Sequence, residues 1–88
     1  MRKVIYQRKF KQDIKKIKKR GSDLEKLKAV ICLLIRDEIL PQNNHNHKLC
    51  GEFKGYWECH IAPNWLLMYK KAANELILAR TGSHSDLF

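Results

Sequence analysis

The four histidines of this chain are the side chains best suited to acid–base chemistry, and all of them lie in its second half: His45, His47, His60 and His84. An imidazole with an ordinary pKa of about 6.5 can take up and release a proton near neutral pH. Cleavage of RNA by its own 2′-hydroxyl needs both events, together with positive charge beside the phosphorane. Scattered histidines are more often surface or core residues, so this inventory alone does not establish a nuclease.

The positive charge of the chain is concentrated at its start. Residues 1–20 contain ten Lys or Arg and one acid, whereas residues 21–88 contain eight of each sign. The formal net charge of +9 therefore belongs to the first quarter of the chain. Such a field attracts polyanions. A solvated helix face is the plainer explanation, but the asymmetry favours nucleic acid as the partner, with an acidic protein as the alternative.

The elements that must position these residues begin with a short strand over residues 4–6 and a helix over residues 8–20. The helix is indicated by apolar residues spaced four and three apart, which are Phe10, Ile14 and Ile17. Gly21 can end this helix in the left-handed conformation. Ser22 or Asp23 can then cap a second helix, which we expect to stop at Pro41.

The second half of the chain predicts strands. Residues 42–47 are polar and we expect them to be irregular, whereas residues 56–61, 65–70 and 75–80 have the composition of strands separated by turns. The order is β-α-α-β-β-β, which predicts an α+β fold with two N-terminal helices packed on one face of a small antiparallel sheet. The other face is then open to a ligand, and residues 81–88 form a polar tail.

Alternation along residues 56–61 separates two sets of side chains. Tyr56, Glu58 and His60 share one face of the strand. The opposite face carries Trp57, Cys59 and Ile61. A cysteine among apolar neighbours is a poor candidate for a nucleophile.

A zinc site needs to be weighed, because five potential ligands fall within residues 45–60: His45, His47, Cys50, Cys59 and His60. There is no Cys-x-x-Cys pair, and Cys59 and His60 are adjacent on a strand and face opposite sides, so one ion cannot use both. We expect no metal and no cofactor. The cysteine number is odd, which argues against a disulfide framework and favours a reducing cytoplasm.

The length of 88 residues allows one domain, residues 1–88, with one modest core. No apolar run approaches 18 residues, so no membrane span is expected. The lysine-rich start has no apolar signal segment, which again favours the cytoplasm.

The motifs of the second half closely resemble the YafQ-type toxins of the RelE family, and the helical first half fits the same plan. These motifs are His47-Lys-Leu-Cys-Gly51, Lys54-Gly-Tyr, Glu58-Cys-His60-Ile, Pro63-Asn-Trp65-Leu-Leu-Met-Tyr69, Glu75-Leu-Ile-Leu and Arg80-Thr-Gly-Ser-His-Ser-Asp-Leu-Phe88. The resemblance implies a RelE-like fold and a ribosome-dependent endoribonuclease that cuts messenger RNA without a metal. It also implies a cognate acidic antitoxin, with operator DNA bound only through the antitoxin complex.

The resemblance assigns roles residue by residue. His47, His60 and His84 match the acid–base set, and Arg80 stands where an arginine contacts phosphate, unless it pairs structurally with Glu58 or Glu75. The remaining residues expected to bind substrate are Trp65, Phe88, Lys54, Lys15 and Lys18. The expected product is a 2′,3′-cyclic phosphate.

Two departures from the family pattern bear on activity. Asn64 replaces an aspartate that contributes to catalysis in the family, and an amide cannot exchange a proton or hold negative charge. Trp57 replaces a frequent arginine. A second hypothesis follows: a catalytically weakened, toxin-like module that binds an antitoxin, the ribosome or operator DNA.

Overall fold

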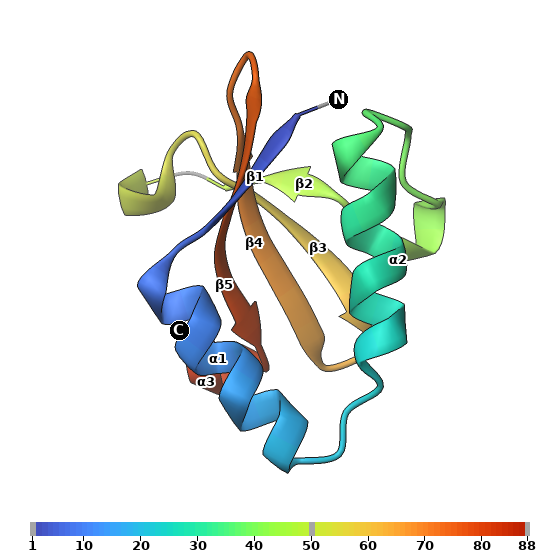
Figure 1. The fold of residues 1–88 in the computed structure, drawn as a ribbon, viewed down its shortest axis with the longest axis vertical. Coiled ribbons are helices and arrows are strands. Elements are labelled where there is room, and N and C mark those ends of the chain that lie inside the picture. Colours follow the sequence, from blue (N-terminus) through green and yellow to red (C-terminus); the bar gives the residue numbers. More distant parts are fainter. Residues whose placement is uncertain (1, 50, 88) are drawn as a thin grey trace.

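The computed structural model describes residues 2–49 and 51–87, apart from the side chain of residue 52. Two helices lie on one face of a five-stranded sheet whose strand order is β1-β5-β4-β3-β2 (Figure 1). The α+β class and the two-helix arrangement are therefore confirmed. The elements are β1 (Lys3–Tyr6), α1 (Arg8–Lys19), α2 (Leu24–Ile35), η1 (Gln42–Asn44), β2 (His47–Lys48), η2 (Gly51–Phe53), β3 (Trp57–Ala62), β4 (Trp65–Lys71), β5 (Glu75–Gly82) and α3 (His84–Leu87).

Helix α1 forms where its apolar spacing predicted it. Phe10 and Ile17 are buried in the core, and Gly21 follows the helix with φ +77°. Asp13 lies on the same face and is also buried, although carboxylates are rarely buried without a partner. A buried acid in this position calls for a specific basic partner.

Helix α2 begins at the predicted cap but ends before the predicted stop. The carboxylate of Asp23 accepts a hydrogen bond from the backbone N–H of Glu25 at 3.0 Å. The helix ends at Ile35, where Asp37 takes a left-handed conformation and the N–H of Glu38 returns to the carbonyl of Leu33 at 2.9 Å. This return hydrogen bond satisfies an end carbonyl without any need for proline.

The sheet is antiparallel except at one edge. Strand β1 pairs in parallel with β5, with Lys3 opposite Glu75 and Tyr6 opposite Leu78. The predicted antiparallel sheet is confirmed for β2 to β5, whereas β1 joins its edge in parallel, and the first and last strands are far apart in sequence. No hairpin turn fixes their relative direction.

The two faces of β4 are both buried. Alternate residues Trp65, Leu67 and Tyr69 belong to the core beneath the helices. Leu66 and Met68, which point to the other face by alternation, are also almost fully buried. The face that we expected to be open is therefore partly covered, and α3 packs back against β5.

Two segments predicted to be irregular contain regular structure. Residues 42–47 include the single turn η1 and the start of β2, which pairs His47 with Glu58 of β3. The predicted polar tail extends β5 to Gly82 and then forms α3. Both elements depend on contacts with distant parts of the chain. Among the residues described, none of the helices is long and apolar enough to cross a membrane.

Candidate active site

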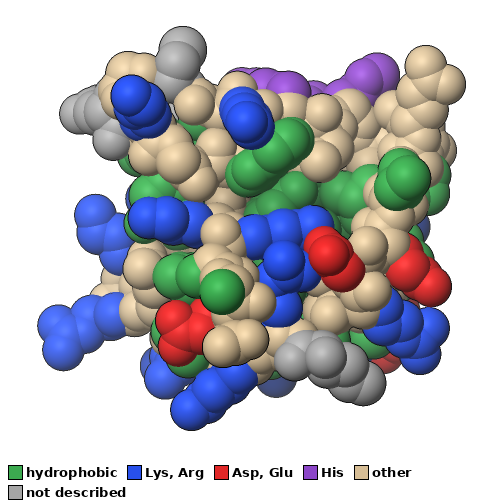
Figure 2. All heavy atoms as spheres, turned by 90° about the horizontal axis from the view of Figure 1, so that it is seen from above, with side chains coloured by type: hydrophobic (Ala, Val, Ile, Leu, Met, Phe, Trp, Pro, Cys, Tyr) green, Lys and Arg blue, Asp and Glu red, His purple; other side chains and the backbone are tan. Residues whose placement is uncertain are grey.

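The imidazole rings of three histidines form a continuous cluster. The ring of His60, on β3, lies 5.4 Å from that of His45 and 6.2 Å from that of His84, centroid to centroid, and both contacts are edge to face. His45 ends η1 and His84 begins α3, so the cluster joins three separate stretches of chain. Figure 2 shows the histidine side chains gathered along one edge of the molecule.

His47 adjoins this cluster through Glu58. The two residues are paired between β2 and β3, and His47 Nε2 lies 3.4 Å from Oε1 of the buried Glu58 carboxylate. The other ring nitrogen, Nδ1, lies 2.9 Å from the backbone oxygen of His45. Glu58 precedes His60 by two residues on the same face of β3, so His47 lies within the same site.

Two side-chain hydrogen bonds fix the loop that carries His45 and His47. Asn44 Nδ2 donates to the backbone oxygen of His60 at 2.6 Å, and the hydroxyl of Tyr69 donates to Asn46 Oδ1 at 2.5 Å. Burial raises the pKa of the Tyr69 hydroxyl, so this group stays protonated and remains a donor. The loop is therefore tied directly to the central strands.

Helix α3, which carries His84, is held by a capping box. The Asp86 carboxylate accepts from the backbone N–H of Ser83 at 2.9 Å, and the Ser83 hydroxyl accepts from the N–H of Asp86 at 3.3 Å. Gly82 has φ +152°, and a Cβ at this position would lie 2.9–3.3 Å from side-chain atoms of Asp86. Only glycine allows the carboxylate to approach the backbone this closely.

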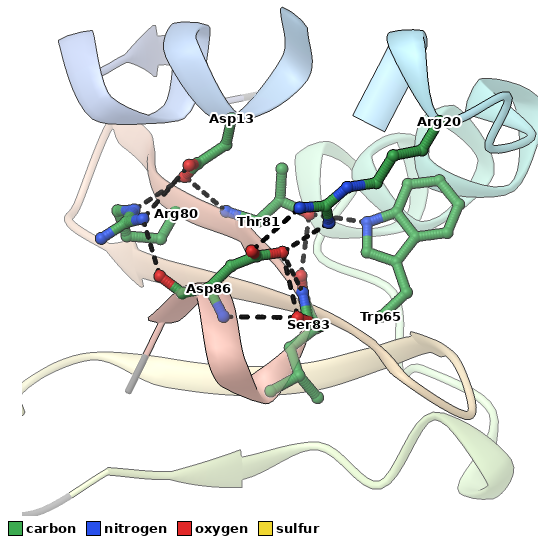
Figure 3. A network of polar contacts seen from close by, with 8 residues as sticks. Asp13, Arg20, Trp65, Arg80, Thr81, Ser83 and Asp86 are labelled. Atoms are coloured by element: carbon green, nitrogen blue, oxygen red, sulfur yellow. Dashed lines mark hydrogen bonds and ion pairs between the residues drawn. The ribbon is translucent and has the colours of Figure 1, made fainter. Parts of the chain in front are cut away.

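The same carboxylate ties α3 to the end of α1. Arg20 donates to the two oxygens of Asp86 at 2.7 and 3.1 Å (Figure 3). The hydrogen bonds from Arg20 and from the Ser83 backbone hold the pKa of Asp86 well below its usual value. The basic last turn of α1 is thereby brought beside the helix that begins with His84.

The Asp86 contacts predict a pH-dependent stability. A depressed folded-state pKa stabilises the fold fully above the unfolded-state pKa, about 3.9, and less as the pH falls toward the folded-state value. We expect the melting temperature of Asp86→Asn to lie below that of the wild type at pH 6, and this gap to narrow from pH 4 to pH 2. Thermal melts from pH 6 to pH 2 measure this difference in melting temperature. Lys19→Gln is the control, and we expect its difference from the wild type not to narrow as the pH falls. A gap for Asp86→Asn that stays constant with pH would contradict the assignment.

A second network joins α1 to the end of β5 (Figure 3). Asp13 accepts from Arg80 Nε at 2.7 Å, from Arg80 Nη2 at 3.1 Å and from the backbone N–H of Thr81 at 3.1 Å. The Asp13 carboxylate raises the pKa of the Arg80 guanidinium. Arg80 also donates to the backbone oxygen of Asp86 at 3.2 Å. The structure corrects the structural alternative for Arg80, because its guanidinium is paired with Asp13 rather than with Glu58 or Glu75, whereas its contact with phosphate stays a prediction.

Trp65 also needs correction as a substrate-binding residue. Its side chain packs in the core, and its indole N–H donates to the Thr81 hydroxyl at 2.8 Å. The same hydroxyl donates to the backbone oxygen of Leu66 at 2.8 Å. With only 8% of the residue exposed, the ring has no free face on which a base could stack.

The other expected site residues lie outside these networks. Asn64 is exposed in the tight turn between β3 and β4, and no described residue bonds to its side chain. Lys15 and Lys18 are exposed on α1, and Lys54 is exposed between η2 and β3. Phe88 lies outside the described residues.

Residue types alone did not identify His45 and Glu58 as parts of the site. His45 was not among the expected acid–base residues, yet its ring contacts that of His60. Glu58 was considered only as a partner for Arg80. Its alternation with His60 placed both on one face, and this signal was sufficient to predict that the carboxylate lies in the site.

Cys59 lies on the core side of β3, as the alternation predicted. Its burial raises the pKa of the thiol to about 12, which keeps it protonated and unreactive near neutral pH. Among the described side chains, which do not include that of residue 52, no three from His, Cys, Asp or Glu are arranged to hold a metal ion.

Comparison with known proteins gives matches along the whole chain. The profile of the family described as "Bacterial toxin of type II toxin-antitoxin system, YafQ" matches residues 2–88. The mRNA interferase toxin YafQ of Escherichia coli K12 is 39% identical over 88 residues, covering 99% of this chain and 96% of that protein. The crystal structure of a copper-bound mutant toxin from Helicobacter pylori has a TM-score of 0.96 at 40% identity, covering both chains fully. A chain of the E. coli DinJ–YafQ complex has a TM-score of 0.93 at 38% identity, covering 100% of this chain and 99% of that one. The matched regions include every segment that contributes a histidine to the cluster.

Proposed function

Because the chain belongs to the YafQ family of toxins from type II toxin–antitoxin systems, we propose that it is a ribosome-dependent endoribonuclease that cleaves messenger RNA by histidine acid–base catalysis. In this proposal residues 1–88 act as one toxin domain. The observation that carries it is the convergence of His47, His60 and His84 from three separate stretches of chain. E. coli YafQ, at 39% identity, bears the name mRNA interferase toxin, which supports the substrate class.

In this proposal His60 and His84 move the two protons of the reaction, which is supported by the edge contact of their rings, whose centroids are 6.2 Å apart. One imidazole takes the 2′ proton while the 2′ oxygen attacks phosphorus. The other gives its proton to the 5′ oxygen as the P–O5′ bond breaks. The products are a 2′,3′-cyclic phosphate and a 5′-hydroxyl.

His47 supplies positive charge for the phosphorane. Its ring lies between the Glu58 carboxyl group and the backbone oxygen of His45, and these two contacts hold it beside the site. A fixed cation beside the site of developing charge needs no rearrangement during the reaction. Because the steps use imidazoles alone, we propose that no metal takes part.

Arg80 and Asp13 act by positioning. Their ion pair holds α1 against the end of β5, and the Arg80 bond to the Asp86 backbone continues the connection into α3. Lys15, Lys18 and Lys54 contribute positive surface for the RNA, which raises the rate of encounter with a polyanion.

The antitoxin is proposed to be an acidic protein. The relative of known structure from E. coli is found in a complex named DinJ–YafQ, which supports a protein partner of this kind. The net charge of +9 favours an acidic partner, which would offset it. Operator DNA is then bound only through the antitoxin complex.

The experiment is induced expression in a bacterial host, followed by mapping of transcript ends with and without translation. We expect new ends bearing 2′,3′-cyclic phosphate only in translated messages, and no such ends for the His60→Ala, His84→Ala double variant. Cleavage should persist in a translating extract that contains a chelator selective for transition metals. Cuts in untranslated RNA would contradict ribosome dependence.

The weakened-module hypothesis is tested in the same assay by Asn64→Asp. If wild-type protein arrests growth without new transcript ends, and Asn64→Asp produces them, then binding rather than cleavage is the native activity. No described residue bonds to the Asn64 side chain, so asparagine at this position does not disturb the histidine cluster, and we expect the wild-type protein to cut.

A further inference from the structure

A hollow of about 400 Å³ opens beside His60. It is lined on one side by Asn43, Asn44 and His45, and on the other by residues 60–63 at the end of β3. Its volume lies within the range of about 300–1,000 Å³ that is typical of small-ligand sites. His60 belongs both to this hollow and to the ring contact with His84.

The walls of the hollow are held in place by the local backbone. Strand β2 is only two residues long, and its pairing with β3 ends at Glu58. Beyond Glu58, the free edge of β3 is contacted by η1 instead of by a strand. The bond from Asn44 Nδ2 to the His60 carbonyl fixes η1 there. The pairing of β3 with β4 shifts register between His60 and Ala62, a bulge of the kind that re-aims neighbouring side chains.

His45 is presented to the hollow by an uncommon backbone conformation. Its φ of 47° and ψ of 51° are left-handed, and its N–H donates to the carbonyl of Gln42 at 3.1 Å. Non-glycine residues rarely adopt this region, although histidine and asparagine do so more often than most. The exposed ring lies at the rim of the hollow, in edge contact with His60.

We propose that this hollow binds the base of the nucleotide next to the scissile phosphate, and that His45 selects which base is accepted. This inference rests on the proposed function and deepens it. Unpaired bases are recognised by stacking on ring side chains and by hydrogen bonds to their edges. The His45 ring can stack on the base, and the Asn43 amide has donors and an acceptor for hydrogen bonds to the base edge. Ile61, Ala62 and Pro63 give apolar contact.

The position of His60 explains why the hollow affects base choice. A phosphate held between His60 and His84 has a neighbouring nucleotide on each side along the strand. The hollow lies against His60, so it is within reach of one of those nucleotides. Binding there aligns the phosphate with the imidazoles, and a poorly fitting base places it less well.

The test compares His45→Asn with Gln42→Ala by mapping every cut across the transcripts. Asparagine tolerates the left-handed conformation, so this variant removes the ring but keeps the backbone. Gln42 lies in the same turn but does not line the hollow. We expect His45→Asn to lower cutting next to purines about fivefold relative to cutting next to pyrimidines, because the larger purine rings lose more stacking when the imidazole is removed. Gln42→Ala is expected to keep the wild-type distribution.

The outcomes separate this inference from the proposed function. If the His60→Ala, His84→Ala variant still cuts translated messages, the proposed function fails. If that variant is silent while His45→Asn cuts with the wild-type distribution of bases, only the base subsite is rejected. Equal loss of cutting at all bases in folded His45→Asn also rejects it, because His45 then serves the reaction rather than the choice of base.

Discussion

Replacing His60 alone with alanine is expected to slow messenger RNA cleavage by roughly 10²- to 10⁴-fold, the usual contribution of one positioned acid or base. His60 is the centre of the cluster, since its ring touches both His45 and His84 and its carbonyl anchors Asn44. The backbone anchor survives the substitution, because it uses the carbonyl oxygen. The loss should therefore appear in the rate of cutting rather than in the fold.

The measurement is the rate of appearance of cut transcript in a translating extract with purified protein. Glu75→Ala serves as the control, because Glu75 is exposed at the start of β5 and takes no part in the site. An unfolded His60→Ala protein is recognised by its circular dichroism. Near-wild-type cutting by the folded variant would show that His60 is not an acid or base in this reaction.

Replacing Asp13 with alanine is expected to lower the free energy of unfolding by about 3 kcal/mol, the lower end of the cost of breaking a buried ion pair. Asp13 is 4% exposed and accepts three hydrogen bonds, two from Arg80 and one from the Thr81 backbone. Its removal leaves a partly buried guanidinium and an N–H without their acceptor. Since domains of this kind are stable by only about 5–15 kcal/mol in total, the loss is large.

Urea unfolding of the variant and the wild type measures this difference. Glu25→Ala is the matched control, because Glu25 forms an exposed ion pair with Lys28 at 3.4 Å, and such pairs contribute less than about 1 kcal/mol. A loss for Asp13→Ala no greater than that for Glu25→Ala would show that the network of Asp13, Arg80 and Thr81 does not stabilise the attachment of α1 to β5.

The sequence by itself determined the elements whose signals are local. The spacing of Phe10 and Ile17 specifies α1, and Gly21 and Asp23 mark the turn and the cap that follow it. Alternation along β3 placed Glu58 and His60 on one face and Cys59 on the other. These signals depend on neighbours within a few residues, so they can be read before the chain is folded.

Only the tertiary structure decided which residues meet across long separations. The parallel pairing of β1 with β5, the Asp13–Arg80 ion pair and the Arg20–Asp86 ion pair each join parts of the chain more than 60 residues apart. The helical spacing places Asp13 on the apolar face of α1, but nothing local indicates that Arg80 and Thr81 are its partners.

The site shows the same division. The four histidines indicated acid–base chemistry, and the family resemblance singled out His47, His60 and His84 among them. That His45 belongs to the cluster could be seen only in the folded structure. It follows from the left-handed turn at the end of η1 and from the hydrogen bond that Asn44 donates to the His60 carbonyl on β3. The role of Trp65 likewise changed from surface to core because Thr81, sixteen residues away, provides the buried partner that its indole N–H needs. Residue type and spacing determine which chemistry a side chain is capable of, whereas burial and bonding partners in the folded chain determine whether it is available to a ligand.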